Sequence, residues 1–340
     1  MKNSTLTSCK TPYLNNYRGR YFLITIQTKV DRLTKIAEGV IEVTLIAENE
    51  ELLPGYTPGA HVDLFLPNGV TRAYSLTDSS FNRTMRQYVI AVGLSPTSRG
   101  GSDYVHHKLK VGDSLMIGKP RNLFELVESL DPVLLIAGGI GVTPLRAMAL
   151  DLTRQRRTWR MAYAAKSRSH AAYVKELAAL SDSVHFHFDD EHDGCQILID
   201  EVLRDISAQT HIYCCGPQGM MKRVRECTSA HPIDHLHFES FGTTAELQPI
   251  AGRAFSVVLA REGKTIEIAK DQSILDALEA NGFVVPSVCR EGVCGSCECT
   301  VLEGDIDHRD VILSQDEKAA NQTMMLCVSR ARGNRLVLDL

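Results

Sequence analysis

The chain contains the run Cys289-Arg290-Glu291-Gly292-Val293-Cys294-Gly295-Ser296-Cys297, and one further cysteine, Cys327, follows far downstream. The spacing is C-x4-C-x2-C-x29-C, and its first three cysteines match the spacing that binds a plant-type [2Fe–2S] cluster. Two irons need four thiolates, so a tight loop would supply three and Cys327 would close the cage. Gly292 and Gly295 allow the loop to turn sharply and point backbone N–H groups at the sulfurs. The four cysteines are therefore predicted to hold an iron–sulfur cluster.

A zinc site and reduced structural thiols are the alternatives for these cysteines. Zinc usually takes paired C-x2-C units, and this pattern has only one. Residues 254–340, roughly, resemble plant-type ferredoxins, which implies an α+β ferredoxin domain of the β-grasp type. Cys299 lies just outside the pattern, at the start of an expected strand, and we expect it to be a buried free cysteine.

Composition places the chain among ordinary soluble globular proteins. Its 340 residues suggest two or three domains, and 44% are hydrophobic and 23% charged. The net charge of −4 gives no argument for nucleic-acid binding. Apolar runs are too short to span a bilayer, and residues 1–20 lack the apolar core of a signal peptide, so no membrane association is expected. Ten cysteines without a secretion signal indicate a reducing compartment, and we expect the cytoplasm.

Residues 21–130 show short β-branched and apolar runs separated by turns, which predicts a small antiparallel β-barrel. Within it lies Arg72-Ala73-Tyr74-Ser75. Alternation along a strand puts Arg72 and Tyr74 on one face, with Ser75 on the other face or at a bend. An arginine can clamp a phosphate, a tyrosine can stack on a ring, and a hydroxyl can reach a ring nitrogen. The alternative is an ordinary strand with one exposed arginine.

A second feature of this region is Gly100-Gly101-Ser102, followed by a helical pattern to Leu109. Two glycines before an expected serine N-cap, Ser102, predict an anion site at a helix start.

Residues 131–241 contain two strand–turn–helix units. The apolar strand Val133–Ala137 runs into Gly138-Gly139-Ile140-Gly141-Val142-Thr143-Pro144, and a helix is expected over 145–155. This arrangement predicts the first half of a nucleotide-binding unit, with a tight βα turn as the alternative. The strand 211–214 then leads into Cys215-Gly216-Pro217 and a helix to about Ala230. This turn predicts a second crevice at the end of a strand.

Three other stretches bear on the nucleotide. The strand 159–165 ends in Lys166-Ser167-Arg168, where a second strand would meet an adenosine ribose. A pocket for the 2′-phosphate of NADPH would carry more basic residues, so NADH is favoured over NADPH. The next element expected is a helix over 171–180. In the strand 184–188, the apolar residues are expected to face the core. A metal site is disfavoured because the histidines His185, His187 and His192 are expected to face water. A last strand is expected over 237–241.

Together these motifs resemble the phthalate dioxygenase reductase family of the ferredoxin–NADP reductase superfamily, over about residues 21–340. Vanillate demethylase reductase components are similar. The resemblance implies FMN bound by the Arg72-Ala73-Tyr74-Ser75 stretch. Arg72 and Gly100-Gly101-Ser102 would hold its phosphate, and Tyr74 and Ser75 would face its ring. For NADH it implies a site lined by Gly138, Gly139, Gly141, Thr143, Ser167 and Arg168. Cys215 would lie beside the nicotinamide, Gly216 and Pro217 would shape the pocket, and Glu239 or Phe241 would border the active site.

The implied organisation is multidomain: a tail (1–20), an FMN-binding antiparallel β-barrel (21–130), an NAD-binding α/β domain with a parallel sheet (131–241), a linker (242–253) and the ferredoxin (254–340). The ferredoxin region has nine Lys or Arg against fourteen Asp or Glu, a net charge of −5. This surplus would steer a basic partner or simply favour solubility.

The implied function is that of the reductase component of a two-component Rieske-type oxygenase or demethylase in aromatic catabolism. A nicotinamide gives two electrons and a Rieske centre accepts one, and flavin with an iron–sulfur cluster bridges that difference. The chain has no Rieske or 2-His-1-carboxylate pattern, so a separate oxygenase should oxidise the substrate. The alternatives are a reductase for a haem monooxygenase, and an electron carrier or redox sensor with an inactive reductase half.

Overall fold

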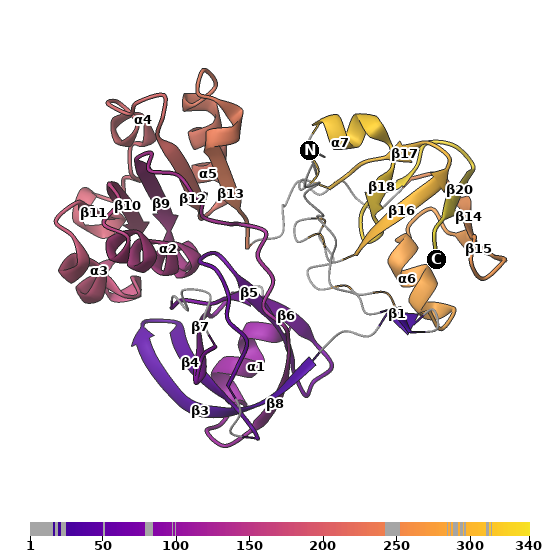
Figure 1. Cartoon of the computed structure of the whole chain (residues 1–340), viewed down its shortest axis with the longest axis horizontal. Helices are drawn as coiled ribbons and strands as arrows, with labels where there is room; N and C mark the ends of the chain where they lie inside the picture. The colour runs from indigo at the N-terminus through magenta and orange to yellow at the C-terminus, as the bar shows by residue number, and fades with distance from the viewer. Residues whose placement is uncertain are drawn as a thin grey trace, which may run out of the picture.

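The computed structural model describes residues 16–17, 20–21, 25–49, 52–78, 84–96, 98, 100–241, 252–283, 285, 287, 292, 295, 297–310, 313 and 315–340. Three lobes follow one another along the chain, from indigo and purple through salmon to yellow (Figure 1). Most of the expected tail and linker lies outside the described residues, as do two of the predicted cluster ligands, Cys289 and Cys294. The only elements described before residue 25 are the short strands β1 (Asn16–Tyr17) and β2 (Arg20–Tyr21), which pair with each other.

The first lobe is a six-stranded antiparallel sheet in the order β6-β5-β8-β3-β4-β7. Its elements are β3 (Thr25–Ala37), β4 (Val40–Ala47), β5 (His61–Phe65), β6 (Thr71–Ser75), β7 (Gln87–Gly93), β8 (Ser114–Gly118) and helix α1 (Gly101–His107). An isolated bridge between Leu76 and Ile90 joins the two edge strands, so the sheet curls back on itself. Alternate residues such as Val62 and Leu64 point into its core, because successive side chains of a strand face opposite sides.

The second lobe is a five-stranded parallel sheet in the order β11-β10-β9-β12-β13. Its strands are β9 (Val133–Gly138), β10 (Trp159–Ala165), β11 (Val184–Phe188), β12 (His211–Cys215) and β13 (Leu236–Glu239). Its helices are α2 (Val142–Arg154), α3 (Val174–Leu180), α4 (Ile199–Val202) and α5 (Gln218–Cys227). The central strand β9 is apolar throughout because both of its faces are buried. The chain order reverses at β9, and in parallel sheets a ligand crevice is expected at such a point, here at the carboxyl ends of β9 and β12.

Three details of this lobe differ from the sequence expectations. Helix α3 begins at Val174 rather than Ala171, because Tyr173 has a left-handed backbone (φ 61°). Helix α2 begins three residues earlier than expected, directly after a 3₁₀ turn over Gly139–Gly141. His187 does not face water: it is 8% exposed, and its Nε2 lies 2.8 Å from the Cys195 carbonyl. Within the described residues, no group of three or more His, Cys, Asp or Glu could hold a metal ion.

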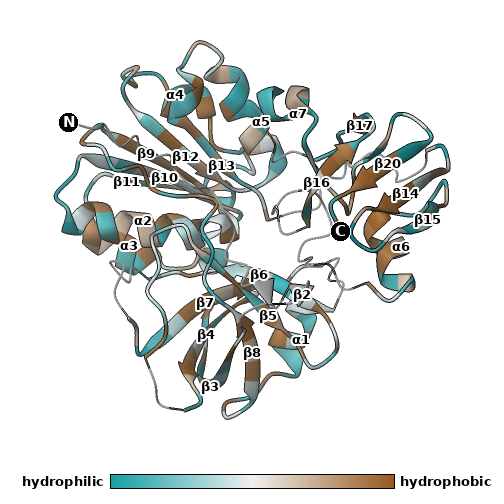
Figure 2. Ribbon diagram, turned by 45° about the vertical axis from the view of Figure 1, so that its right-hand side comes forward, coloured by the Kyte–Doolittle hydropathy of each residue, from teal (hydrophilic) through white to brown (hydrophobic). Residues whose placement is uncertain are grey.

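The third lobe has a five-stranded sheet in the order β15-β14-β20-β16-β18, in which only β14 and β20 run parallel. Its main elements are β14 (Phe255–Leu259), β15 (Lys264–Ile268), α6 (Ile274–Ala280), β16 (Glu298–Glu303), α7 (Gln315–Ala320), β18 (Thr323–Met325) and β20 (Arg335–Leu338). Two short strands, β17 (Ile306–Asp307) and β19 (Arg330–Ala331), pair beside it. Ser273 caps α6 by accepting a hydrogen bond of 2.9 Å from the Asp276 amide. In all three lobes the strands carry the most hydrophobic stretches (Figure 2). No helix among the described residues is long and apolar enough to cross a membrane.

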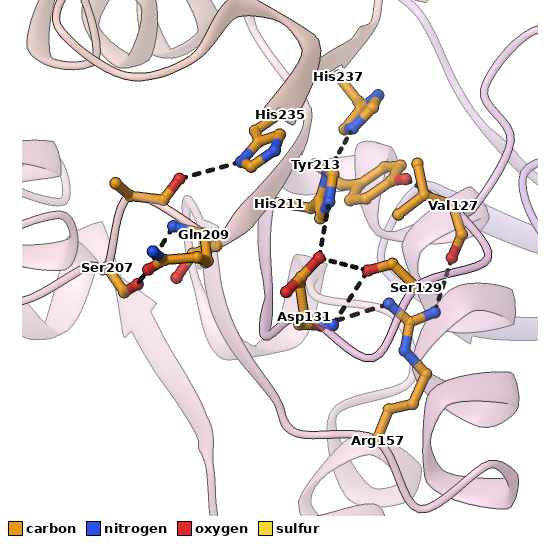
Figure 3. Close-up of polar contacts among 12 residues, drawn as sticks. Val127, Ser129, Asp131, Arg157, Ser207, Gln209, His211, Tyr213, His235 and His237 are labelled. Carbon is orange, nitrogen blue, oxygen red and sulfur yellow. Dashed lines mark hydrogen bonds and ion pairs between the residues drawn. The ribbon is translucent and has the colours of Figure 1, made fainter.

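The segment that connects the first two lobes is held against the second lobe by hydrogen bonds (Figure 3). The Tyr213 hydroxyl accepts a hydrogen bond from the Val127 amide (2.9 Å), and Arg157 donates to the Val127 carbonyl (2.8 Å). Asp131 lies 3.8 Å from His211 Nε2, and His211 Nδ1 lies 3.2 Å from His237 Nε2. Burial, followed by the neighbouring histidines, lowers the pKa of His237 to about 4, so the His237 imidazole is uncharged at neutral pH.

Candidate active site

The arginine of β6 and the glycines of α1 come together in the structure. A Cβ atom at Gly101 would lie 2.6 Å from Arg72 Cγ and 3.1 Å from its Nε, so the Arg72 side chain packs directly over Gly101. The guanidinium of Arg72 therefore lies next to the amide groups that begin α1. A cation beside such amides suits a phosphate group.

Ser102 is not the N-cap that the sequence suggested. Helix α1 begins at Gly101, and its N-cap is Gly100, which has a left-handed backbone (φ 88°). The Ser102 hydroxyl donates to Ser98 Oγ (3.1 Å) and accepts from the Ser95 amide (3.2 Å). Helix α1 already begins at Gly101, because Gly100 takes the N-cap position. Ser102 therefore lies inside the first helical turn, where its hydroxyl stabilises the preceding loop.

Ser75 carries a polar atom that the protein leaves unsatisfied. The residue is 4% exposed, and its Oγ has no hydrogen-bond partner among the described residues. A buried hydroxyl without a partner costs about 1–3 kcal/mol, so this one fits a ligand that completes the site. Tyr74 precedes it, and burial raises the pKa of its phenol to about 12 despite the nearby charge of Arg72. A neutral ring and a hydroxyl on one strand end fit a flavin ring.

Two glycine turns of the parallel sheet are packed directly against each other. A Cβ at Gly138 would lie 2.4 Å from Pro217 Cδ, and a Cβ at Gly141 would lie 2.1 Å from the Cys215 carbonyl oxygen. Gly141 has an ordinary helical backbone (φ −61°), so glycine is needed there for space alone. Thr143 donates to the Ile140 carbonyl (2.9 Å) and closes the first turn. A Cβ at Gly216 would lie 2.9 Å from Gly138 Cα, so the two turns pack against each other at the carboxyl ends of β9 and β12.

Cys215 and Glu239 are neighbours at the carboxyl ends of β12 and β13, where the register of the two strands pairs them. Cys215 is fully buried, and burial, followed by the Glu239 carboxylate, raises the pKa of its thiol well above the ordinary range. The thiol is therefore neutral and is not a nucleophile. Glu239 Oε2 is buried and has no hydrogen-bond partner in the described part of the chain, and burial raises the pKa of this carboxyl to about 8. Phe241, expected within the last strand, lies two residues beyond its end and is 44% exposed.

The residues expected near the adenosine ribose follow β10. Arg168 Nε donates to Glu191 Oε1 (3.1 Å), and the Arg168 guanidinium lies 4.4 Å from the centre of the Phe188 ring. The Ser167 hydroxyl lies 2.6 Å from His170 Nδ1. Sequence reasoning missed Glu191, whose carboxylate offsets the charge of the one arginine in the predicted ribose site.

Sequence reasoning also missed the polar residues that join the first two lobes. Arg146, the fifth residue of α2, donates to the Thr77 carbonyl (2.8 Å) and to Asp78 Oδ1 (2.6 Å) in the first lobe. A Cβ at Gly93 would lie 3.4 Å from the Ile140 side chain, which brings the rim of the first sheet against the first glycine turn. No sequence signal marks these residues, because their partners are remote along the chain.

The described part of the predicted cluster site contains Cys297 and Cys327, each 3% exposed. The Leu326 amide donates to the Cys297 carbonyl (3.2 Å), so the loop and the distant segment meet as the spacing requires. Gly292 has a left-handed backbone (φ 68°), and a Cβ there would lie 2.5 Å from Val328 Cγ2. Cys299 is a buried free cysteine in β16, which confirms that prediction.

Known proteins share these features over most of the chain. Residues 257–332 match the family described as the 2Fe-2S iron-sulfur cluster binding domain, and residues 135–226 match the oxidoreductase NAD-binding domain. Tetrachlorobenzoquinone reductase of Sphingobium chlorophenolicum is 39% identical, over 93% of this chain and 98% of that protein.

Two solved structures are also similar. Phthalate dioxygenase reductase, described as a modular structure for electron transfer from pyridine nucleotides to [2Fe-2S], is 36% identical with a TM-score of 0.70. That match covers 93% of this chain and 98% of the other. An intact type IV self-sufficient cytochrome P450 monooxygenase is 37% identical with a TM-score of 0.82. This match covers 93% of the present chain but only 41% of that longer protein.

Proposed function

Because this chain belongs to the phthalate dioxygenase reductase family, we propose that it is the NADH-dependent reductase component of a Rieske-type oxygenase or demethylase system. The observation that carries the proposal is the junction of the first two lobes. The strand β6 ends at Ser75, whose buried hydroxyl has no hydrogen-bond partner among the described residues. Two residues later, the Thr77 carbonyl accepts a hydrogen bond from Arg146, which follows the first glycine turn in α2. The proposed flavin site and the proposed nucleotide site would therefore adjoin each other.

The domain limits follow the three sheets. We infer a flavin barrel over residues 21–130, an NAD-binding domain over 131–241 and, after a linker at 242–253, a ferredoxin over 254–340. The strands of the first sheet end at Gly118, those of the second lie within 133–239, and those of the third within 255–338. The family's redox groups are FMN, a [2Fe–2S] cluster and NADH.

The first lobe provides a fitting site for FMN. Arg72 and the amides of Gly100 and Gly101 would hold the phosphate, while Tyr74 and Ser75 would face the ring. When bound there, FMN would supply two-electron acceptance of hydride from NADH and one-electron release. The Ser75 hydroxyl would donate to a ring nitrogen, since it has no other hydrogen-bond partner among the described residues.

The second lobe would bind and orient NADH. The turns that contain Gly138, Gly139, Gly141 and Thr143, and Cys215, Gly216 and Pro217, would hold the pyrophosphate and nicotinamide. Ser167 and Arg168 would lie near the ribose. The neutral Cys215 thiol would pack beside the nicotinamide, and Glu239 would hold a proton on its buried carboxyl near neutral pH. Phe241 would lie at the rim of the site.

The third lobe would carry the cluster on Cys289, Cys294, Cys297 and Cys327, and would pass single electrons to a separate oxygenase. We favour a Rieske-type partner because of the similarity to phthalate dioxygenase reductase along almost its whole length. A haem monooxygenase is the second candidate, favoured by the similarity to part of a self-sufficient cytochrome P450.

An anaerobic titration with NADH, followed by visible absorption and run beside NADPH, tests the proposal. Bleaching of the flavin together with reduction of the cluster supports it, and the absence of any change with either nucleotide contradicts it. The reduced protein is then mixed with a purified Rieske oxygenase or a purified cytochrome P450. Faster reoxidation by the haem protein than by the Rieske protein would favour the second candidate.

A further inference from the structure

We propose that Arg146 is a positioning residue for hydride transfer, which ties the strand end carrying the flavin motif to the helix that begins at the nicotinamide turn. The proposal rests on the function proposed above and adds a specific residue to it. Arg146 would contact neither reacting group. It would act by fixing the first two lobes relative to each other.

The guanidinium of Arg146 is fully engaged between the lobes. One side donates to the Thr77 carbonyl (2.8 Å) and Asp78 Oδ1 (2.6 Å) of the first lobe. The other side donates from Nε (3.1 Å) and Nη2 (2.7 Å) to Glu176 Oε2 of the second lobe. The side chains of Arg146 and Asp78 are 13% and 32% exposed, so solvent screens the charge-assisted bond between the lobes less than the Arg146–Glu176 pair, in which Glu176 is 57% exposed.

Tyr173 extends the same contact to a second strand of the first lobe. The guanidinium of Arg146 lies 4.5 Å from the centre of the Tyr173 ring, and the Tyr173 hydroxyl donates to Glu42 Oε2 in β4 (2.9 Å). Close by, the Glu38 amide donates to the Ser169 carbonyl (2.8 Å), a backbone bond that also joins the two lobes. Arg146 thus lies at the centre of an interface with anchors on two strands of the first lobe.

The position of this interface gives it a functional consequence. Thr77 follows Ser75 by two residues, and Arg146 follows Thr143 by three, so the contact lies immediately behind both proposed binding motifs. Hydride transfer needs its two reacting atoms within about 3–3.5 Å, and a 1 Å misplacement can cost about a hundredfold in rate. NADH itself would be held by the second lobe alone. Loss of the contact should therefore slow the transfer and leave nucleotide affinity nearly unchanged.

The test uses stopped-flow reduction of the full-length holoprotein by NADH, in which the limiting rate and the apparent Kd are obtained from one concentration series. In R146Q we expect the limiting rate to fall by about 10- to 100-fold, with the Kd within about threefold of wild type. R146K keeps the positive charge but cannot donate to both lobes as the guanidinium does, so its limiting rate should lie between those of R146Q and wild type. The matched control is R223Q, because Arg223 also pairs with two carboxylates, Asp200 and Glu226, but only within the second lobe.

Hydrogen exchange of the Glu38 amide gives a readout that is independent of activity, because this amide bonds across the interface. We expect faster exchange there in R146Q and no change in R223Q. D78N removes the partner from the other lobe, so it repeats the test if R146Q folds poorly.

A limiting rate in both R146Q and D78N within twofold of wild type would overturn the proposal, and so would an unchanged Glu38 exchange. If neither NADH nor NADPH reduced the wild-type protein, the proposed function would fail, while the exchange measurement would still test the interface.

Discussion

Replacing Gly141 by alanine should damage the nucleotide site through a purely steric effect. The new Cβ would lie 2.1 Å from the Cys215 carbonyl oxygen and 2.9 Å from the Gly216 amide nitrogen, and contacts below 3.0 Å are essentially never made. The two glycine turns would have to separate by about 1 Å. The neighbours are backbone atoms, so no side chain can rotate away to relieve the contact.

Two quantities should change in this variant. Overpacking of a close-packed contact typically costs about 1–3 kcal/mol of unfolding free energy. A displacement of about 1 Å between the two turns should lower kcat/KM for NADH by about a hundredfold. The backbone of Gly141 is in the helical region, so the conformational preference of alanine adds no penalty.

The chain offers a direct probe of this effect. Trp159 is its single tryptophan and begins β10 in the same sheet, so its fluorescence reports the unfolding of the second lobe in urea. NADH oxidation with an artificial acceptor gives kcat/KM. The control is G333A, because a Cβ there meets nothing within 4 Å. If G141A kept kcat/KM within threefold and unfolding within about 0.5 kcal/mol of wild type, the steric account of the turns would be refuted.

Three further predictions concern polar groups. Ser75→Ala removes a hydroxyl that has no partner among the described residues, so the cofactor-free protein should be at least as stable in urea as the wild type. Its flavin reduction should slow about 10- to 100-fold, and an unchanged stopped-flow rate would contradict this role. Glu191→Gln should release Arg168 for a 2′-phosphate and raise the NADPH-to-NADH ratio of kcat/KM about tenfold; an unchanged ratio would place that phosphate elsewhere. The folded-state pKa of His237 is about 4, below its ordinary value of 6.5, so the unfolded chain binds its proton first as pH falls. The unfolding free energy should therefore fall by up to about 3 kcal/mol between about pH 6.5 and pH 4, less so in His237→Gln, when Trp159 fluorescence is followed in urea. Equal slopes in the two proteins would exclude His237 as the cause.

The sequence predicted the elements whose signal is local. The strands Trp159–Ala165 and Val184–Phe188 have the bounds expected from their sequence patterns. The segments that contain Cys297 and Cys327 are in contact through the Leu326 amide and the Cys297 carbonyl, as the cluster spacing predicted. The two glycine turns were also recognisable, because a turn between a buried strand and a helix has a local composition of its own.

Tertiary contacts decided what local patterns could not. The backbone of Gly100 places the start of α1 at Gly101, which moves Ser102 into the helix. His187 is buried through its contact with Cys195, although strand alternation alone would expose it.

The sequence by itself determined which segments become strands, glycine turns and a cysteine loop, because periodicity and spacing arise from neighbouring residues. Only the tertiary structure decided that Arg146 meets Asp78, 68 residues away, and that the Ser75 hydroxyl is buried with no partner among the residues that the structure describes. The reason is physical: burial and charge pairing depend on which surfaces meet, and that is set by the packing of whole sheets rather than by any one stretch of chain.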